Sequence, residues 1–159
     1  TFPEYLNMYI DAARRQGAEP ILVTPIARRH FSDQGVLIPT HMDYPAAMRD
    51  LAVERGVRLV DLEKATMADF QQLGAEGTLQ VFCHVPAGSP NYPDGAADNS
   101  HLQERGAIQV AALFLALLRG EKTAESPVDA ANGQLSDLSG LAQNAELTDL
   151  IGKEDHVVC

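Results

Sequence analysis

The chain has 159 residues, 45% of them hydrophobic and 21% charged, and a formal net charge of −10. This length is enough for one domain with a sizeable core, and no apolar run approaches the roughly 18 residues that a transmembrane helix needs. The acidic balance argues against a nucleic-acid partner, because neutralising phosphates requires clustered Lys and Arg.

The first quarter of the chain predicts a helix, a strand and an irregular segment. Apolar side chains recur at helical spacing over residues 2–16, and Gly17 follows as a stop signal. The run Ile-Leu-Val at 21–23 lies between prolines, which is typical of a short, buried parallel strand. Residues 26–43 have no clear period and could hold a small hairpin around 34–35.

The middle of the chain continues the alternation. Residues 45–55 predict a second helix, which Gly56 ends. Residues 57–60 predict a second short strand, and residues 62–73 predict a third helix that stops at Gly74.

The last predicted elements are a long loop and a helix. Residues 75–100 are rich in Gly, Pro, Asn and Asp and predict one long loop, and loops of that length in compact domains are usually functional. Residues 102–118 predict a fourth helix, with Ile108, Ala111, Ala112, Leu115 and Leu118 on one face.

This order of elements predicts an α/β fold. Helices alternating with strands form right-handed crossovers around a parallel sheet. Two strands, however, leave both edges of a sheet open and cannot make a doubly wound sheet by themselves. The sequence therefore predicts part of a sheet that other strands complete.

The composition divides the chain at about Gly120. Residues 121–159 contain eight acidic residues and two lysines, so they carry −6 of the net charge of −10. They show little periodicity, which favours an acidic, flexible tail over a short amphipathic helix. We expect a domain portion over 1–120 and a tail over 121–159.

The sharpest chemical feature is Asp98-Asn99-Ser100-His101, just before the last predicted helix. An Asp three residues ahead of a His allows the carboxylate to accept a hydrogen bond from Nδ1–H, while Nε2 faces a nucleophile. The alternative is a helix cap, in which one of the three polar residues caps the helix and His101 is an ordinary first-turn residue. The motif by itself does not decide between these two interpretations.

The sequence around this motif resembles a known family. Residues 81–95 (VFCHVPAGSPNYPDG), followed by the Asp-Asn-Ser-His motif, are similar to the C-terminal block of bacterial rhamnogalacturonan acetylesterase-like enzymes, which are SGNH (GDSL) hydrolases. Further similar segments occur in the same order: PILVTPIARRHF at 20–31, YPAAMR at 44–49, LVDL at 59–62 and Gly-Ala at 106–107. The resemblance covers about residues 2–119.

The resemblance implies a flavodoxin-like three-layer α/β/α fold, here only its C-terminal half. It also implies a Ser-His-Asp triad that hydrolyses O-acetyl esters of pectic polysaccharides without a metal or other cofactor. Asp98 and His101 match the acid and base of that triad. The nucleophilic Ser and the oxyanion-hole Gly and Asn fall in blocks that the chain does not contain, because it has no Gly-Asp-Ser and no Gly-x-Asn-Asp. Ser100 is expected to cap the helix.

Three further residues are candidates for substrate binding. His84 lies in the loop that leads to the Asp-x-x-His motif, although an ordinary loop hydrogen bond would also explain it. Arg28, with Arg29 beside it, follows the first strand and could pair with a uronate carboxylate; a surface salt bridge is the alternative. Tyr92 could stack on a sugar or simply form part of a turn. His41 and His84 lack the spacing of metal ligands.

We therefore expect a carbohydrate O-acetylesterase of the rhamnogalacturonan or pectin type, with no cofactor and an acetylated saccharide as its substrate. No nucleic-acid or membrane partner is expected. The chain alone is predicted to be inactive, because the Ser lies outside it, in an absent N-terminal segment or another chain. The alternative is a non-catalytic, truncated SGNH module that pairs with another chain. A phosphate-binding domain of similar topology is disfavoured, since no Gly-rich phosphate loop occurs. The sequence does not identify the cellular compartment.

Overall fold

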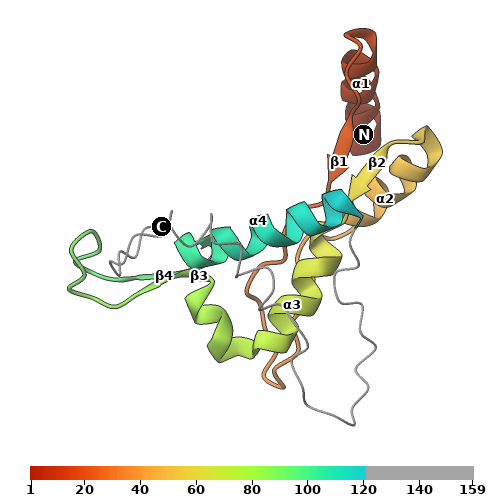
Figure 1. Ribbon diagram of the computed structural model, residues 1–159. Coiled ribbons are helices and arrows are strands. Elements are labelled where there is room, and N and C mark those ends of the chain that lie inside the picture. The colour runs from red at the N-terminus through yellow and green to blue at the C-terminus, as the bar shows by residue number, and fades with distance from the viewer. Residues whose placement is uncertain (121–159) are drawn as a thin grey trace.

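The structure is a computed structural model and describes residues 1–120 (Figure 1). The expected tail at 121–159 lies outside the described residues. None of the described helices is long and apolar enough to cross a membrane. The elements follow the order α1 (Phe2–Arg15), β1 (Ile21–Val23), α2 (Tyr44–Arg55), β2 (Arg58–Val60), α3 (Leu62–Gly77), a 3₁₀ turn (Thr78–Gln80), β3 (Phe82–Val85), β4 (Ala96–Leu102) and α4 (Glu104–Arg119).

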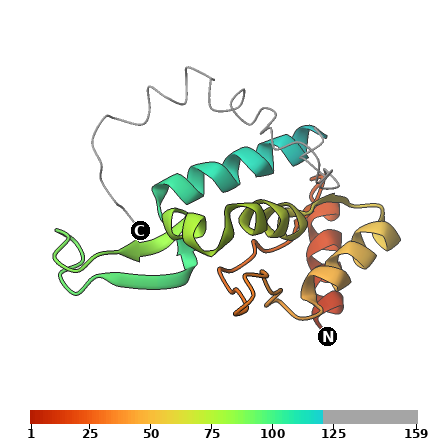
Figure 2. The same cartoon turned by 90° about the horizontal axis from the view of Figure 1, so that it is seen from below.

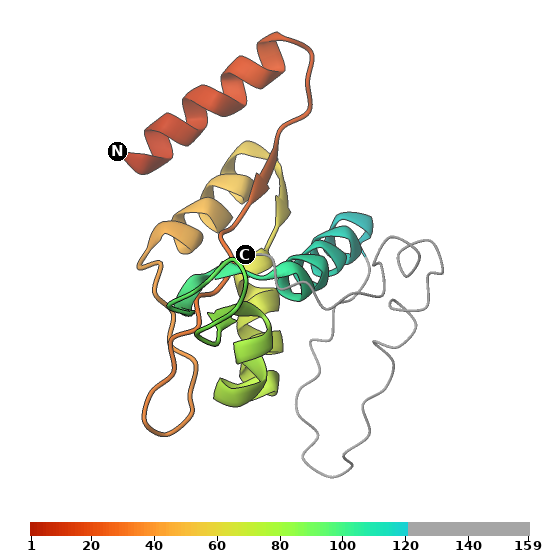
Figure 3. The same cartoon turned by 90° about the vertical axis from the view of Figure 1, so that its left-hand side faces the viewer.

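The strands β1 and β2 form a parallel pair, as the alternation of elements predicts. Leu22 lies opposite Leu59 and Val23 opposite Val60. Because neighbouring residues of a strand point to opposite faces, Leu22 packs with the buried side chains of α1 and α2, whereas Val60 packs with those of α3 and α4. Figure 3 shows α1 and α2 on one side of the pair and α4 on the other. The sheet therefore has helices on both faces.

The strand β1 is less buried than the sequence predicts. Leu22 is buried, but Ile21 and Val23 are 40% and 37% exposed. The backbone N–H of Thr24, just after the strand, donates to the carbonyl of Val60 on β2, so by alternation the N–H of Val23 points to the opposite edge. Among the described residues no strand pairs with that edge. The predicted incomplete sheet is thus present, and its incompleteness is what leaves β1 exposed.

The third helix contains the break that the sequence predicts. Gly74 has φ of 70° and non-helical backbone angles, a conformation that favours Gly because it has no Cβ. The helical path then continues for one short turn to Gly77 instead of ending. The hydroxyl of Thr78 donates to the carbonyl of Gly74 and stabilises this short turn after the break.

The single long loop predicted over residues 75–100 is wrong. The segment instead contains the 3₁₀ turn and an antiparallel hairpin of β3 and β4, with a register shift between Phe82 and His84. The strand forms because Val81, Phe82 and Val85 are buried in the core, a preference that outweighs the turn-forming residues around them. Only residues 86–95 remain as a loop, and the hairpin extends away from the helices (Figure 2).

The helix α4 packs closely against the start of β3. A Cβ at Gly106 would lie 2.1 Å from the carbonyl oxygen of Val81, so only Gly allows this approach. The face that α4 buries is not the apolar face expected from the sequence. Val110 and Ala116 are buried, whereas Ala111 and Leu115 of the expected face are exposed. A helix that is apolar on nearly all sides usually has neighbours on all sides.

Candidate active site

Asp98 and His101 form the predicted hydrogen bond. Both residues lie on β4, and Nδ1 of His101 is 2.7 Å from Oδ2 of Asp98. The other carboxylate oxygen, Oδ1, accepts the backbone N–H groups of Ser100 at 2.6 Å and of His101 at 2.9 Å. The carboxylate therefore closes a tight local turn and holds the imidazole by its Nδ1 side. We call Asp98 and His101 the dyad.

The surroundings of Asp98 keep it ionised. The backbone N–H groups of His101 and Ser100, followed by the imidazole of His101, lower the pKa of Asp98 to about 2. Donors that bind the charged form of an acid have this effect. Since this pKa is depressed, the contacts of the carboxylate persist at neutral pH and are lost only as the pH falls from about 4 toward 2.

The helix-cap interpretation of the motif is wrong. The residue at the N-cap of α4 is Gln103, whose side chain makes no capping hydrogen bond there. Instead, the side chain of Gln103 donates to the carbonyl of Leu79 and its backbone N–H to that of Val81. Ser100, the expected cap, contributes only its backbone N–H to Asp98. The polar residues ahead of α4 thus serve the dyad rather than the helix.

The second nitrogen of His101 is accessible. The side chain is 80% exposed, and within residues 1–120 no hydrogen-bond partner is found for Nε2. None of the serines in this part of the chain bonds to it: the hydroxyl of Ser89 donates to the carbonyl of Pro86, and that of Ser32 accepts backbone N–H groups of its own loop. The described residues thus provide an oriented, exposed imidazole to which no serine is bonded.

His84 lies beside the dyad and is part of a polar contact. Its Nε2 is 2.9 Å from Oδ1 of Asn99, the residue between Asp98 and Ser100. The same oxygen lies 3.2 Å from Nη1 of Arg29. The sequence predicted a possible substrate contact for His84 and mentioned Arg29 only beside Arg28. For Asn99 it predicted at most a capping role.

The remaining candidates lie elsewhere in the fold. Arg28 is exposed, and Tyr92 lies in the loop of the hairpin, where its backbone N–H donates to the carbonyl of Ser89. The Nε2 of His41 pairs with the carbonyl of Ile26. No group of three potential metal ligands occurs within the described part of the chain.

A second polar cluster, which no motif in the sequence indicated, lies where β1 and β2 end. Arg49 donates to Asp61 at 2.7 and 2.9 Å and to Glu63 at 2.7 Å. The hydroxyl of Thr24 donates to Asp61 at 3.0 Å. Burial raises the pKa of Asp61, but the bonds from Arg49, from the backbone of α3 and from Thr24 outweigh it and lower this pKa overall. The cluster joins α2, β1 and α3, which is a structural role.

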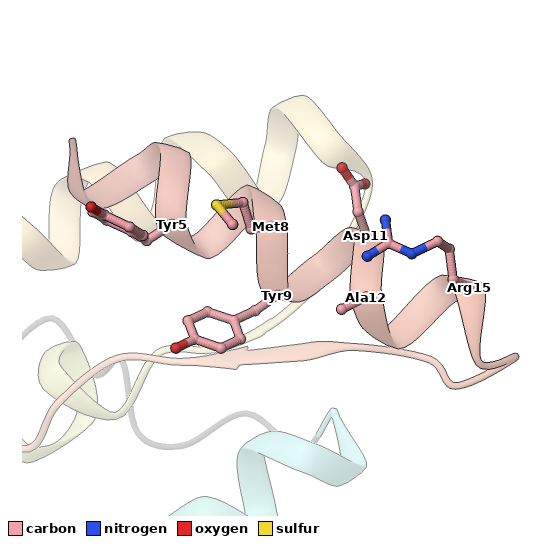
Figure 4. A pocket seen from close by; sticks show the side chains of 6 residues that line it. All are labelled: Tyr5, Met8, Tyr9, Asp11, Ala12 and Arg15. Carbon is pink, nitrogen blue, oxygen red and sulfur yellow. The ribbon is translucent and has the colours of Figure 1, made fainter.

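One hollow in the described surface lies on α1, away from the dyad. It has a volume of about 430 Å³ and is lined by residues of α1: Tyr5, Met8, Tyr9, Asp11, Ala12 and Arg15. Figure 4 shows Tyr9 beside β1, with α1 above the strand and α4 below it. The hollow thus adjoins the open edge of the sheet and not the dyad.

No protein-family model matches the chain, but two curated proteins of Bacillus subtilis (strain 168) do. Rhamnogalacturonan acetylesterase RhgT is 40% identical over 114 residues, which are 71% of this chain and 49% of RhgT. The probable rhamnogalacturonan acetylesterase YesY is 35% identical over 113 residues, which are 71% of this chain and 48% of YesY. The chain is related to rhamnogalacturonan acetylesterases.

A solved structure has a similar fold. The crystal structure of the protein YxiM from Bacillus subtilis matches with a TM-score of 0.60 at 27% identity, over 74% of this chain and 30% of YxiM. The expected resemblance to rhamnogalacturonan acetylesterase-like enzymes and the expected partial α/β fold are therefore confirmed. The chain spans about half the length of its two acetylesterase relatives.

Proposed function

We propose that the chain supplies the acid–base part of a carbohydrate O-acetylesterase that acts on acetylated rhamnogalacturonan or a related pectic polysaccharide. The observation that carries this proposal is the 2.7 Å bond between Asp98 and His101, with Nε2 turned to solvent. The names of the two relatives support the substrate class.

The geometry suits acyl transfer to a serine that lies outside the described residues. As that serine attacks the acetyl carbonyl, Nε2 of His101 takes its proton, and the ionised Asp98 stabilises the imidazolium. The imidazolium then gives the proton to the departing sugar alkoxide, leaving an acetyl-enzyme. Water, deprotonated by the same nitrogen, then attacks the acetyl-enzyme; the bond to the serine oxygen breaks, the imidazolium returns the proton to that oxygen, and acetate leaves.

The chain alone is expected to be inactive. It has no Gly-Asp-Ser and no Gly-x-Asn-Asp, so neither a nucleophile nor oxyanion donors accompany the base. Loss of one oxyanion donor already lowers turnover by roughly 10²–10³. Hydrolysis of p-nitrophenyl acetate by the chain should equal that of the His101→Ala variant; a rate that this substitution abolishes would contradict the expectation.

We further propose that the segment which supplies the nucleophilic serine and the oxyanion donors also supplies the strand that pairs with the open edge of β1. The strand β1 exposes the apolar side chains of Ile21 and Val23, and α1 beside it exposes Tyr5, Met8 and Tyr9. A strand paired with β1 would lie between α1 and α4 (Figure 4) and would cover this surface. Its expected source is the part of an SGNH domain that the chain does not span.

Complementation tests both proposals together. The chain is mixed with the portion of RhgT that does not align with it, and acetate release from acetylated rhamnogalacturonan is measured. We expect a stable complex by size-exclusion chromatography and an activity that both His101→Ala and Asp98→Asn reduce by roughly 10³–10⁴. A complex without activity would favour the non-catalytic module. A folded monomer that does not bind the RhgT portion would refute the proposal that this portion completes the sheet.

The substrate-binding roles of His84, Arg28 and Tyr92 are also proposed. Arg28 is exposed and so remains available to a uronate carboxylate, which it can bind by two parallel hydrogen bonds. In the complemented enzyme, Arg28→Ala should raise KM for the acidic polysaccharide but not for p-nitrophenyl acetate. Equal changes for both substrates would contradict carboxylate binding.

A further inference from the structure

The side-chain oxygen of Asn99 lies between two donors. Nη1 of Arg29 is 3.2 Å away and Nε2 of His84 is 2.9 Å away. Since the guanidinium has only donors, the amide must direct its oxygen toward Arg29, and Nε2 of His84 must then carry a hydrogen and donate it. The two neighbours therefore fix the orientation of the amide.

The same arginine also holds the backbone of Asn99. The backbone N–H of Arg29 donates to the carbonyl oxygen of Asn99 at 2.9 Å. Arg29 thus binds both the side chain and the main chain of one residue, which restricts that residue more than either bond would. The carbonyl belongs to the peptide that joins Asn99 to Ser100, inside the turn that Asp98 closes.

Arg29 is itself firmly held. Its Nη2 donates to the carbonyl of Ala75, next to the break in α3, at 2.8 Å, and the guanidinium carbon lies 6.0 Å from the centre of the Phe31 ring. Arg29 therefore links the segment after β1 and the end of α3 to the strand that carries the dyad.

The ladder between β3 and β4 pairs Ala96, Ala97 and Leu102 but skips residues 98–101, and the bonds of the dyad itself are local. The side-chain hydrogen bonds of Asp98 and His101 found in the described chain all lie within residues 98–101. They fix the shape of the turn but not its place relative to the parallel strands. The turn lies on a hairpin that extends away from the helices (Figure 2).

We propose that Arg29 is a positioning residue for the dyad, acting through Asn99, with His84 as the second donor to the same amide oxygen. Arg29 keeps the hydrogen bonds between Asp98 and residues 100–101 formed and holds this turn beside the segment that follows β1. This inference rests on the proposed role of the dyad, but it concerns a contact that can be tested without any esterase activity.

The test is a ¹³C NMR titration of the Asp98 carboxyl group in the full chain and its variants. In the unaltered chain this pKa is about 2. In Arg29→Ala the turn should open more often, so the pKa should rise by roughly one unit toward the ordinary value, because the backbone donors are lost. Arg29→Lys, which keeps the charge but not the paired geometry, should behave in the same way.

Arg28→Ala is the matched control. It removes the same charge from the neighbouring residue, so any general electrostatic effect appears there as well. Equal pKa changes in Arg28→Ala and Arg29→Ala, or no change in either, would overturn the proposal.

Asn99→Ala serves as the second variant, since its exposed side chain can be removed without threatening the fold. It should raise the pKa of Asp98 in the same direction, and the double variant with Arg29→Ala should add little. An unchanged pKa in Asn99→Ala refutes the contact even where Arg29→Ala does not fold. Because no catalysis is measured, a negative result here is separate from a failure of the esterase proposal.

Discussion

Replacing Gly106 by Ala tests how tightly α4 is docked beside the dyad. The new Cβ would lie 2.1 Å from the carbonyl oxygen and 2.9 Å from Cγ1 of Val81. Real Cβ contacts essentially never fall below 3.0 Å, so the oxygen contact requires a movement of at least about 0.9 Å. The nearest atom belongs to the backbone, and a side-chain rotation cannot relieve the clash.

The energetic effect follows from two opposing terms. Overpacking costs about 1–3 kcal/mol, and the cost should be near the upper end because backbone must move. Ala gains up to about 1 kcal/mol over Gly in a helix. We therefore expect a net loss of about 1–2 kcal/mol, measured by urea denaturation followed by circular dichroism. The bond from Gln103 to Val81, which links the dyad segment to β3, should weaken as well, so the His101 resonances should shift.

Gly77→Ala is the control for this substitution. Its Cβ would lie 3.2 Å from Cβ and 3.7 Å from Cδ2 of Leu73, a contact that a shift of a few tenths of an ångström relieves, so we expect a change in unfolding free energy of less than about 1 kcal/mol. A Gly106→Ala variant that is as stable as the unaltered chain, with unchanged His101 resonances, would refute the packing argument.

Two further substitutions address the charged groups. Arg49→Ala leaves Asp61 and the buried Glu63 without their cation and should cost about 2–3 kcal/mol, less than a fully buried pair because Arg49 is partly exposed; the exposed Arg58→Ala on β2 should change stability by under about 0.5 kcal/mol in the same denaturation assay. Burial raises the pKa of Asp69, and the hydrogen bond from Gln109 only partly offsets this, so its ionised form destabilises the fold as the pH rises above the ordinary value. Asp69→Asn should therefore be more stable than the unaltered chain at pH 7 and equal to it below about pH 4; a difference that does not depend on pH would contradict this reasoning.

Local signals in the sequence were sufficient for the helices and for the dyad. Gly56 ends α2 in the left-handed conformation that favours Gly, and Gly74 breaks α3 where expected. The contact between Asp98 and His101 was predictable because it depends on three residues of spacing and no distant partner.

What the sequence did not predict depends on contacts between distant segments. The strand β3 is buried against α3, as the edge-to-face contact of Phe82 with Phe70 shows, and no local pattern in a Gly- and Pro-rich stretch indicates that partner. The bond between Arg29 and Asn99 joins residues 70 positions apart. The face of α4 was predicted from apolar spacing, yet a helix that is apolar on several sides offers more than one such face.

The short sequence distance between Asp98 and His101 affects how an esterase of this kind could be divided. Under the proposed function, four consecutive residues build the proton-transfer pair, so a cut between the strands of the domain would separate the base from the nucleophile without dismantling either. Reassembly would then restore catalysis by alignment alone. A chain of this type would suit a split reporter, in which acetate release signals that two fused proteins have met.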